Sequence, residues 1–224
     1  MLPASWPCPL PDGQASKEFA LCRDTSRQRR LLIVPALFDE GNKLRRFTVE
    51  VMRRLDAAGI DTFLPDLPGC NESVRPLHEQ TPAIWIESMA AAARHFGATH
   101  VLAIRGGSLF APRFLPVVHY APVKGAAILR QMLRARVLAS RESGNEENRD
   151  TLVEQAMAHG ITLAGYPLGA EFFRNFDVLT PAPEADVIDQ TEIGGSGLWL
   201  RAEPDENPAQ AECLATILTR RIRQ

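Results

Sequence analysis

The chain has 224 residues, 45% of them apolar, which is enough to fill the core of one α/β domain. Its formal net charge of -2 gives no overall attraction to nucleic acid or to an anionic membrane. Prolines interrupt the N-terminal segment and no long apolar run occurs, so we expect neither a signal peptide nor a membrane span. The four scattered cysteines show neither disulfide density nor metal-ligand spacing, which predicts a cytoplasmic protein without metal or cofactor.

Strands and helices alternate from residue 31 onward, a pattern typical of βα units around a mostly parallel sheet. We expect an edge strand at 18–22 and further strands at 31–34, 60–64, 101–104 and 117–120. Asn42 is placed to cap a helix that stops at Gly59, and Thr81 to cap a second helix that stops at Gly97. Between residues 108 and 117, prolines limit any helix to a few turns.

The second half of the chain predicts a lid-like insertion over residues 125–179 inside a single domain of residues 1–224. It begins with a basic amphipathic helix at 125–138, continues through a polar stretch at 140–148, and adds a second helix at 149–159. The segments 161–164 and 170–179 complete it. Residues 180–197 are rich in proline, glycine and acids and predict a loop, followed by a last strand at 198–200 and a helix from about Pro208.

The strand at 101–104 runs into a sequence that fits a nucleophile elbow, the tight strand-to-helix turn of G-x-S-x-G. Small residues are needed on both sides of the nucleophile, and Ala103 and Gly107 meet that need. The nucleophile position, however, holds Arg105. Guanidinium stays protonated and has no lone pair with which to attack a carbonyl.

Several blocks together resemble the exosortase A system-associated hydrolases of the second type, a branch of the α/β-hydrolase superfamily. The most specific block is residues 35–46, which includes Asn42 and Lys43. Further blocks are residues 66–73, the elbow at 103–107, residues 163–168, and 198–199 with Glu203. The resemblance implies a three-layer α/β-hydrolase fold with a mostly parallel sheet and a small helical insertion. It also implies a role in exosortase-linked exopolysaccharide production and protein sorting. Asn71 and Glu72 depart from the family pattern.

A Ser-His-Asp triad is not visible, because none of the five histidines follows the last predicted strand, where this fold places its base. The turn that follows the last predicted strand carries Glu203 instead of a histidine. We expect Arg105 to meet Asp39, Glu40 or Glu203, either as an internal ion pair or as a two-pronged clamp for a ligand carboxylate or phosphate. Ser108 and Cys70 are the weak candidates for a nucleophile, and Asn42 is a candidate pocket residue.

Two functions stay open at this point. One is a hydrolase of an acyl or other anionic small molecule. The other is a non-catalytic ligand-binding or scaffold protein with a degenerate hydrolase site, which the missing serine and histidine favour. Basic residues on the helix at 125–138 predict either a solvated face or a docking site for an acidic partner such as an acyl carrier protein.

Overall fold

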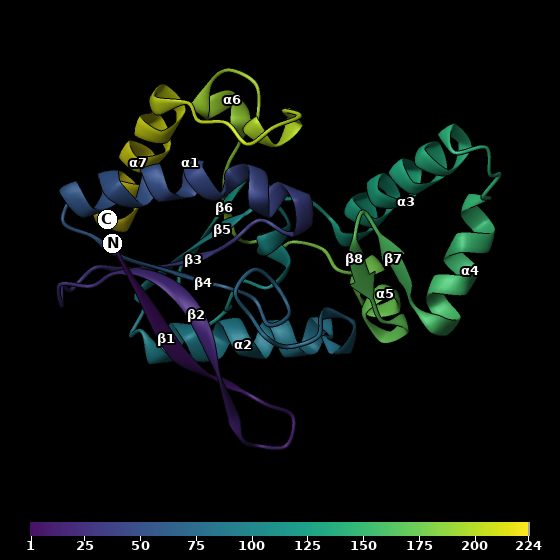
Figure 1. The fold of residues 1–224 in the computed structure, drawn as a ribbon. Helices are drawn as coiled ribbons and strands as arrows, with labels where there is room; N and C mark the ends of the chain where they lie inside the picture. The colour runs from purple at the N-terminus through teal and green to yellow at the C-terminus, as the bar shows by residue number, and fades with distance from the viewer. Residues whose placement is uncertain (224) are drawn as a thin grey trace.

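The computed structural model describes residues 1–223. Seven strands form one twisted sheet in the order β1-β2-β4-β3-β5-β6-β9 (Figure 1). The last five of these strands are parallel, and β1 and β2 run antiparallel to their neighbours. The strands are β1 (Leu2–Pro9), β2 (Ala15–Arg23), β3 (Arg30–Val34), β4 (Asp61–Pro65), β5 (His100–Ile104), β6 (Val117–Tyr120) and β9 (Asp186–Ile188).

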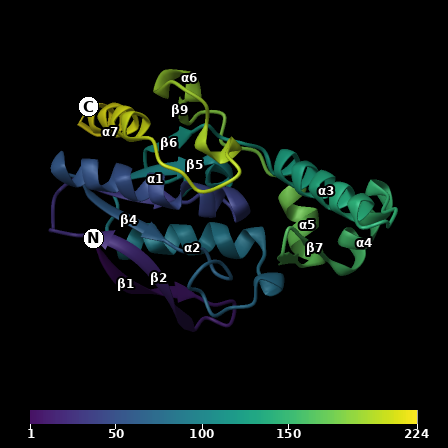
Figure 2. The same cartoon turned by 45° about the horizontal axis from the view of Figure 1, so that its top comes forward.

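Helices cover both faces of the sheet, which gives the predicted three layers. Figures 1 and 2 show α1 (Phe38–Ala57) and α7 (Pro208–Arg223) on one face and α2 (Pro82–His95) on the other. Each face has its own apolar core, and the central strands β3 and β5 contribute side chains to both. These strands are buried on both sides, which explains why their sequences are continuous apolar runs without polar alternation.

The N-terminal part corrects one prediction. The strand expected at the sheet edge is β2, which lies inside the sheet between β4 and a strand that the sequence did not reveal, β1. Prolines at positions 3, 7 and 9 argued against a strand there. An edge strand tolerates them because one row of its N–H groups faces solvent and needs no partner.

The insertion forms a small cap at one end of the sheet (Figures 1 and 2). It contains α3 (Gly125–Glu142), α4 (Arg149–His159), the hairpin of β7 (Ile161–Leu163) and β8 (Tyr166–Leu168), and α5 (Ala170–Asp177). The basic helix runs four residues further than expected, into the polar stretch. Gly125 lets α3 start close to α5, because a Cβ there would lie 1.9 Å from the Phe176 carbonyl oxygen.

Two further predictions fail near the C-terminus. Residues 198–200 form a 3₁₀ turn, η3 (Leu198–Leu200), and add no strand to the sheet. The last strand is instead β9, followed by α6 (Gln190–Ile193), inside the segment expected to be a loop. Leu198 is buried in the core beside α1 and Trp199 packs against the Tyr120 ring, whereas Leu200 is 74% exposed, so the burial in this segment comes from tertiary contacts and not from a strand.

Candidate functional site

The turn after β5 has the geometry of a nucleophile elbow. Arg105 has a φ of 52°, in the left-handed region that a bulky side chain rarely adopts, and begins the single 3₁₀ turn η2 (Arg105–Leu109). A Cβ at Gly107 would lie 2.4 Å from the Pro35 carbonyl oxygen, so the turn can pack against the end of β3 only with glycine there. The sequence therefore located the elbow correctly, and the helix that follows it is shortened to one turn.

Arg105 is fixed by three hydrogen bonds and one aromatic ring. Its Nε and Nη2 donate to the two carboxylate oxygens of Glu40 at 3.0 and 2.9 Å, and its Nη1 donates to the Ala121 carbonyl oxygen at 2.8 Å. The guanidinium carbon lies 4.1 Å from the centre of the Trp199 ring. Only 14% of the Arg105 side chain and 16% of the Glu40 side chain are exposed, so each charge depends on the other.

The other two carboxylates expected at Arg105 lie elsewhere. Asp39 is 63% exposed and pairs with Lys43 one helical turn further along α1. Glu203 is exposed in the loop before α7, because no strand at 198–200 brings it to the edge of the sheet. In its place Trp199 covers the guanidinium. Among residues 1–223, Glu40 is the carboxylate that pairs with Arg105.

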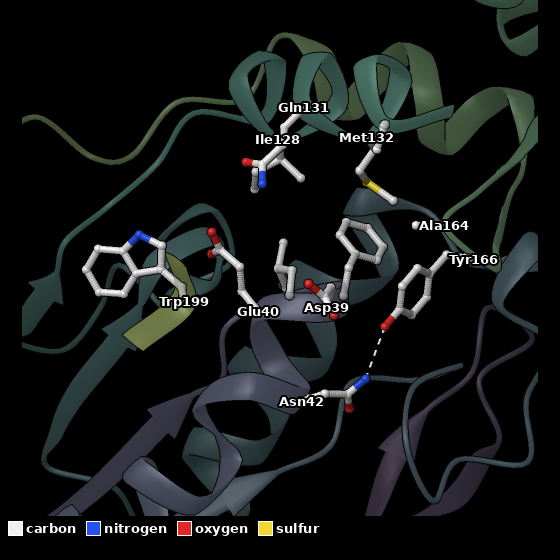
Figure 3. A pocket seen from close by; sticks show the side chains of 12 residues that line it. Asp39, Glu40, Asn42, Ile128, Gln131, Met132, Ala164, Tyr166 and Trp199 are labelled. Atoms are coloured by element: carbon white, nitrogen blue, oxygen red, sulfur yellow. Dashed lines mark hydrogen bonds between the residues drawn. The ribbon is translucent and has the colours of Figure 1, made fainter. Parts of the chain in front are cut away.

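A cavity of about 390 Å³ lies between the start of α1 and the cap (Figure 3). Figure 3 shows Ile128, Gln131 and Met132 reaching down from α3, with Asp39 and Glu40 on the opposite wall. The volume suits a small ligand. Its other walls come from Leu37, Phe38, Asn42, Ala135, Ala164, Tyr166 and Trp199.

Asn42 lines this cavity from inside α1, whereas the sequence had placed it at the start of the helix. The helix begins at Phe38, so Asn42 lies inside α1 and does not cap it. Its Nδ2 donates to the Tyr166 hydroxyl at 3.2 Å, which joins the body to the cap hairpin (Figure 3). Tyr166 also contacts Phe38 edge-on, with ring centres 5.1 Å apart. The resemblance had pointed to both segments, and the tertiary structure brings them together.

A second cavity of about 270 Å³ lies on the other side of this bridge and shares Leu37, Phe38, Asn42 and Tyr166 with the first. Cys70 lines it. Burial and the neighbouring Asp66 and Glu18 charges raise the pKa of the Cys70 thiol to about 12. Since the thiolate is the nucleophilic form, this environment opposes a catalytic role for Cys70.

Ser108 is buried in η2, and its hydroxyl donates to the Arg105 carbonyl oxygen at 2.7 Å. This side-chain bond spans the 3₁₀ turn and occupies the Ser108 hydroxyl. His119, on the neighbouring strand β6, lines a separate cavity of about 230 Å³ together with Ser108. Both ring nitrogens of His119 are buried without a hydrogen-bond partner, and burial lowers its pKa. The structure thus forms no serine–histidine hydrogen bond here.

Unusual backbone conformations gather around the site. Six non-glycine residues within 1–223 have positive φ, and all but Ser26 adjoin the two cavities or the Arg105 pair. Such conformations are costly and are concentrated at functional sites, because the surrounding structure must hold them in place. The five are Phe38, Asn71, Arg105, Ala121 and Ala164.

Within residues 1–223 no group of three or more histidine, cysteine, aspartate or glutamate side chains is placed to hold a metal ion. None of the helices described is both long and apolar enough to cross a bilayer.

Solved structures with the same arrangement of strands and helices identify the class of fold. Mouse alpha/beta hydrolase domain-containing protein 10 has a TM-score of 0.59 at 12% identity, with 92% of this chain and 94% of that chain covered. DcsB in complex with its substrate analogue has a TM-score of 0.57 at 11% identity, covering 99% and 98%. Est1E from Butyrivibrio proteoclasticus with bound ferulic acid has a TM-score of 0.53 at 12% identity, covering 92% and 93%.

The protein therefore has an α/β-hydrolase fold, as the sequence predicted. At these identities the likeness concerns the fold alone. No protein-family model matches the chain, and no curated protein does.

Three contacts of the site escaped sequence reasoning. The Ala121 carbonyl, the Trp199 ring and the Tyr166 hydroxyl all reach the site from segments that are distant in sequence. Trp199 and Tyr166 lie in blocks that carry the resemblance, and this was the one available signal. Ala121 gave none, because a backbone carbonyl has no sequence signature.

Proposed function

We propose that this protein binds an acyl compound in the cavity beneath α3 and does not hydrolyse it through a serine triad. The observation that carries the proposal is the Arg105–Glu40 pair. A guanidinium stands where the fold places its nucleophile. A carboxylate extends from the segment after β3, which in hydrolases supplies an N–H group to the oxyanion. The cation cannot attack a carbonyl, and the carboxylate opposes a developing negative charge.

Packing around Gly106 supports the same conclusion. In hydrolases the residue after the nucleophile gives its N–H to the oxyanion. Here that residue is Gly106, and a Cβ added to it would lie 2.8 Å from both Leu37 Cδ1 and Ile128 Cδ1. Apolar side chains from the body and from the cap therefore pack against the glycine. A residue with a larger side chain would therefore not fit at the position that follows the nucleophile.

The cavity walls indicate the chemistry of the ligand. Leu37, Phe38, Ile128 and Met132 offer apolar surface to a chain, while the carboxylates accept hydrogen bonds and the side-chain amides of Asn42 and Gln131 both donate and accept them. Because Glu40 already satisfies the guanidinium of Arg105, an anionic head would face carboxylates without a free cation. A neutral head that donates hydrogen bonds, such as an amide or a hydroxyl, fits better.

Decanamide and decanoate, which share one chain length, test this preference by calorimetric titration. We expect decanamide to bind and decanoate to bind more weakly. Stronger binding of decanoate would contradict the preference for a neutral head group. It would favour the two-pronged clamp, in which the ligand carboxylate displaces Glu40 from Arg105. If neither compound binds, the acyl-binding function is wrong.

The bridge between Asn42 and Tyr166 is expected to limit the length of the chain, because it separates the two cavities. Tyr166→Ala removes the ring and joins the cavities, so longer acyl amides should bind better to this variant. Tyr166→Phe is the matched control, since it removes the hydrogen bond and keeps the ring as a wall. An unchanged length preference in Tyr166→Ala would show that the second cavity takes no part.

A second candidate is a hydrolase of an acyl or other anionic small molecule, for which the shared cavity of Ser108 and His119 is the specific support. It requires the Ser108 hydroxyl to leave the Arg105 carbonyl and turn toward His119. Covalent labelling by a fluorophosphonate at Ser108, lost in Ser108→Ala, would favour this hydrolase over the binding function.

The cellular role rests on the resemblance to exosortase-associated hydrolases and extends our proposal to exosortase-linked exopolysaccharide production and protein sorting. All four cysteines are free, which suits a reducing cytoplasm. Deleting the gene should reduce secreted exopolysaccharide or misroute sorted proteins, and restoring it should reverse the defect. Normal secretion and sorting in the deletion strain would remove this role and leave the binding site untouched.

A further inference from the structure

Helix α3 has two different faces. One face, with Ile128, Gln131, Met132 and Ala135, forms the roof of the ligand cavity. The other face lines a groove of about 670 Å³ on the outside of the cap. The groove residues on this helix lie on one side of it: Ala126, Arg130, Arg134 and Val137 follow at intervals of three or four, and Leu138 lies four residues after Arg134.

The groove carries an excess of positive charge on a chain whose overall charge is -2. Three arginines line it, Arg130 and Arg134 from α3 and Arg149 from the start of α4, against the single acid Asp177. Within residues 1–223, neither Arg130 nor Arg134 has an ion-pair partner, whereas Arg136 on the same helix pairs with Glu147 at 2.6 Å. The two unpaired guanidiniums lie one helical turn apart and are free to meet carboxylates.

Apolar surface lies beside these charges. Leu138 is 51% exposed and Val178, just past Asp177, is 74% exposed. Arginine is enriched in protein–protein interfaces, and the exposed aliphatic side chains beside these arginines add apolar contact area for a partner.

From these features we infer that the groove receives an acidic helix of a small carrier protein, one that brings acyl chains to the cavity. The inference of an acyl cargo rests on the proposed function, whereas the docking itself rests on charge and shape. The groove is walled by α3, α4 and α5, and a concave surface of this kind accepts the ridge of a helix better than a flat membrane. Carboxylates spaced along an acidic helix would match Arg130 and Arg134 at one-turn spacing.

Titration with a purified acyl carrier protein in its apo form, which has no acyl chain, tests the docking. The groove variant Arg130→Glu/Arg134→Glu should bind at least about tenfold more weakly than the unchanged protein, and added salt should weaken the binding of the unchanged protein. The matched control Arg29→Glu/Arg220→Glu makes the same charge change at exposed arginines on the body. Its affinity should stay within about twofold. Circular dichroism establishes that the variants are folded.

Three results would overturn the inference. The unchanged protein does not bind the carrier, both double variants lose binding equally, or phosphatidylglycerol vesicles bind at the groove while the carrier does not. Decanamide titration separates this inference from the proposed function, because the groove variant should bind decanamide normally. Carrier binding without decanamide binding would retain the docking surface and refute the acyl cavity.

Discussion

Replacing Arg105 by alanine tests the central pair of the site. The change removes both donors to Glu40, the donor to the Ala121 carbonyl and the cation over Trp199. Glu40 is only 16% exposed and would be left as a mostly buried carboxylate without a counter-charge. Breaking a buried pair in this way costs about 3–5 kcal/mol. For a chain of this size, 1 kcal/mol shifts Tm by about 2–4 °C, so we expect Tm to fall by about 6–20 °C.

Calorimetry and urea unfolding of matched variants measure the effect. Arg46→Ala removes one partner of an exposed pair with Glu206 and should cost no more than about 1 kcal/mol. The double variant Arg105→Ala/Glu40→Ala should lose less stability than the sum of the two single variants, by about 0.5–3 kcal/mol, because it leaves no lone charge. The reasoning is refuted if Arg105→Ala is no less stable than Arg46→Ala. Loss of decanamide binding with unchanged Tm would instead assign Arg105 to the ligand.

Other predictions concern residues around the elbow. His119→Leu should raise stability by about 1–3 kcal/mol, because it removes two buried nitrogens without partners. The same substitution should also make stability depend less on pH. Burial lowers the pKa of His119 from 6.5 in the folded state, so as the pH drops below about 6.5 the unfolded chain takes up the proton first and the stability of the unchanged protein falls. An equal slope of Tm against pH in both proteins would contradict this. The native protein should not react with a fluorophosphonate, because the Ser108 hydroxyl is bonded to a carbonyl and has no base beside it; labelling above a denatured control would place the nucleophile at Ser108. Iodoacetamide near neutral pH should modify Cys70 only after unfolding, as mass spectrometry can establish, since a pKa of about 12 leaves almost no thiolate. Gly107→Ala should yield little folded protein on expression, because its Cβ would overlap the Pro35 carbonyl, and a soluble variant of normal Tm would show that the elbow can shift.

Local signals predicted much of the architecture. Apolar runs placed the parallel strands β3 and β5 to within a residue, because strands buried on both faces leave no polar alternation, and β6 was also placed at its observed bounds. Thr81 accepts from the Ile84 N–H at the start of α2, as its position before Pro82 predicted. The strand at 198–200 was wrong because an apolar triplet leaves the backbone conformation open: the segment forms a 3₁₀ turn that buries Leu198 and exposes Leu200.

The candidate site also has features that the sequence predicted and contacts that only the structure reveals. The sequence alone determined the position of the elbow and the absence of a nucleophile at Arg105, because both depend on residue types within a short segment. The α/β class followed from the alternation of strands and helices along the chain, and the hydrolase fold from the resemblance. Only the tertiary structure decided that Glu40, and neither Asp39 nor Glu203, holds the guanidinium, that Trp199 covers it, and that Tyr166 closes the cavity against Asn42. Neighbours on a helix point in different directions, and the partner of a charge is chosen by which side chain the fold brings within about 3 Å. That choice depends on the packing of α1, the cap and the segment before α7, which the spacing of residues along the chain does not encode.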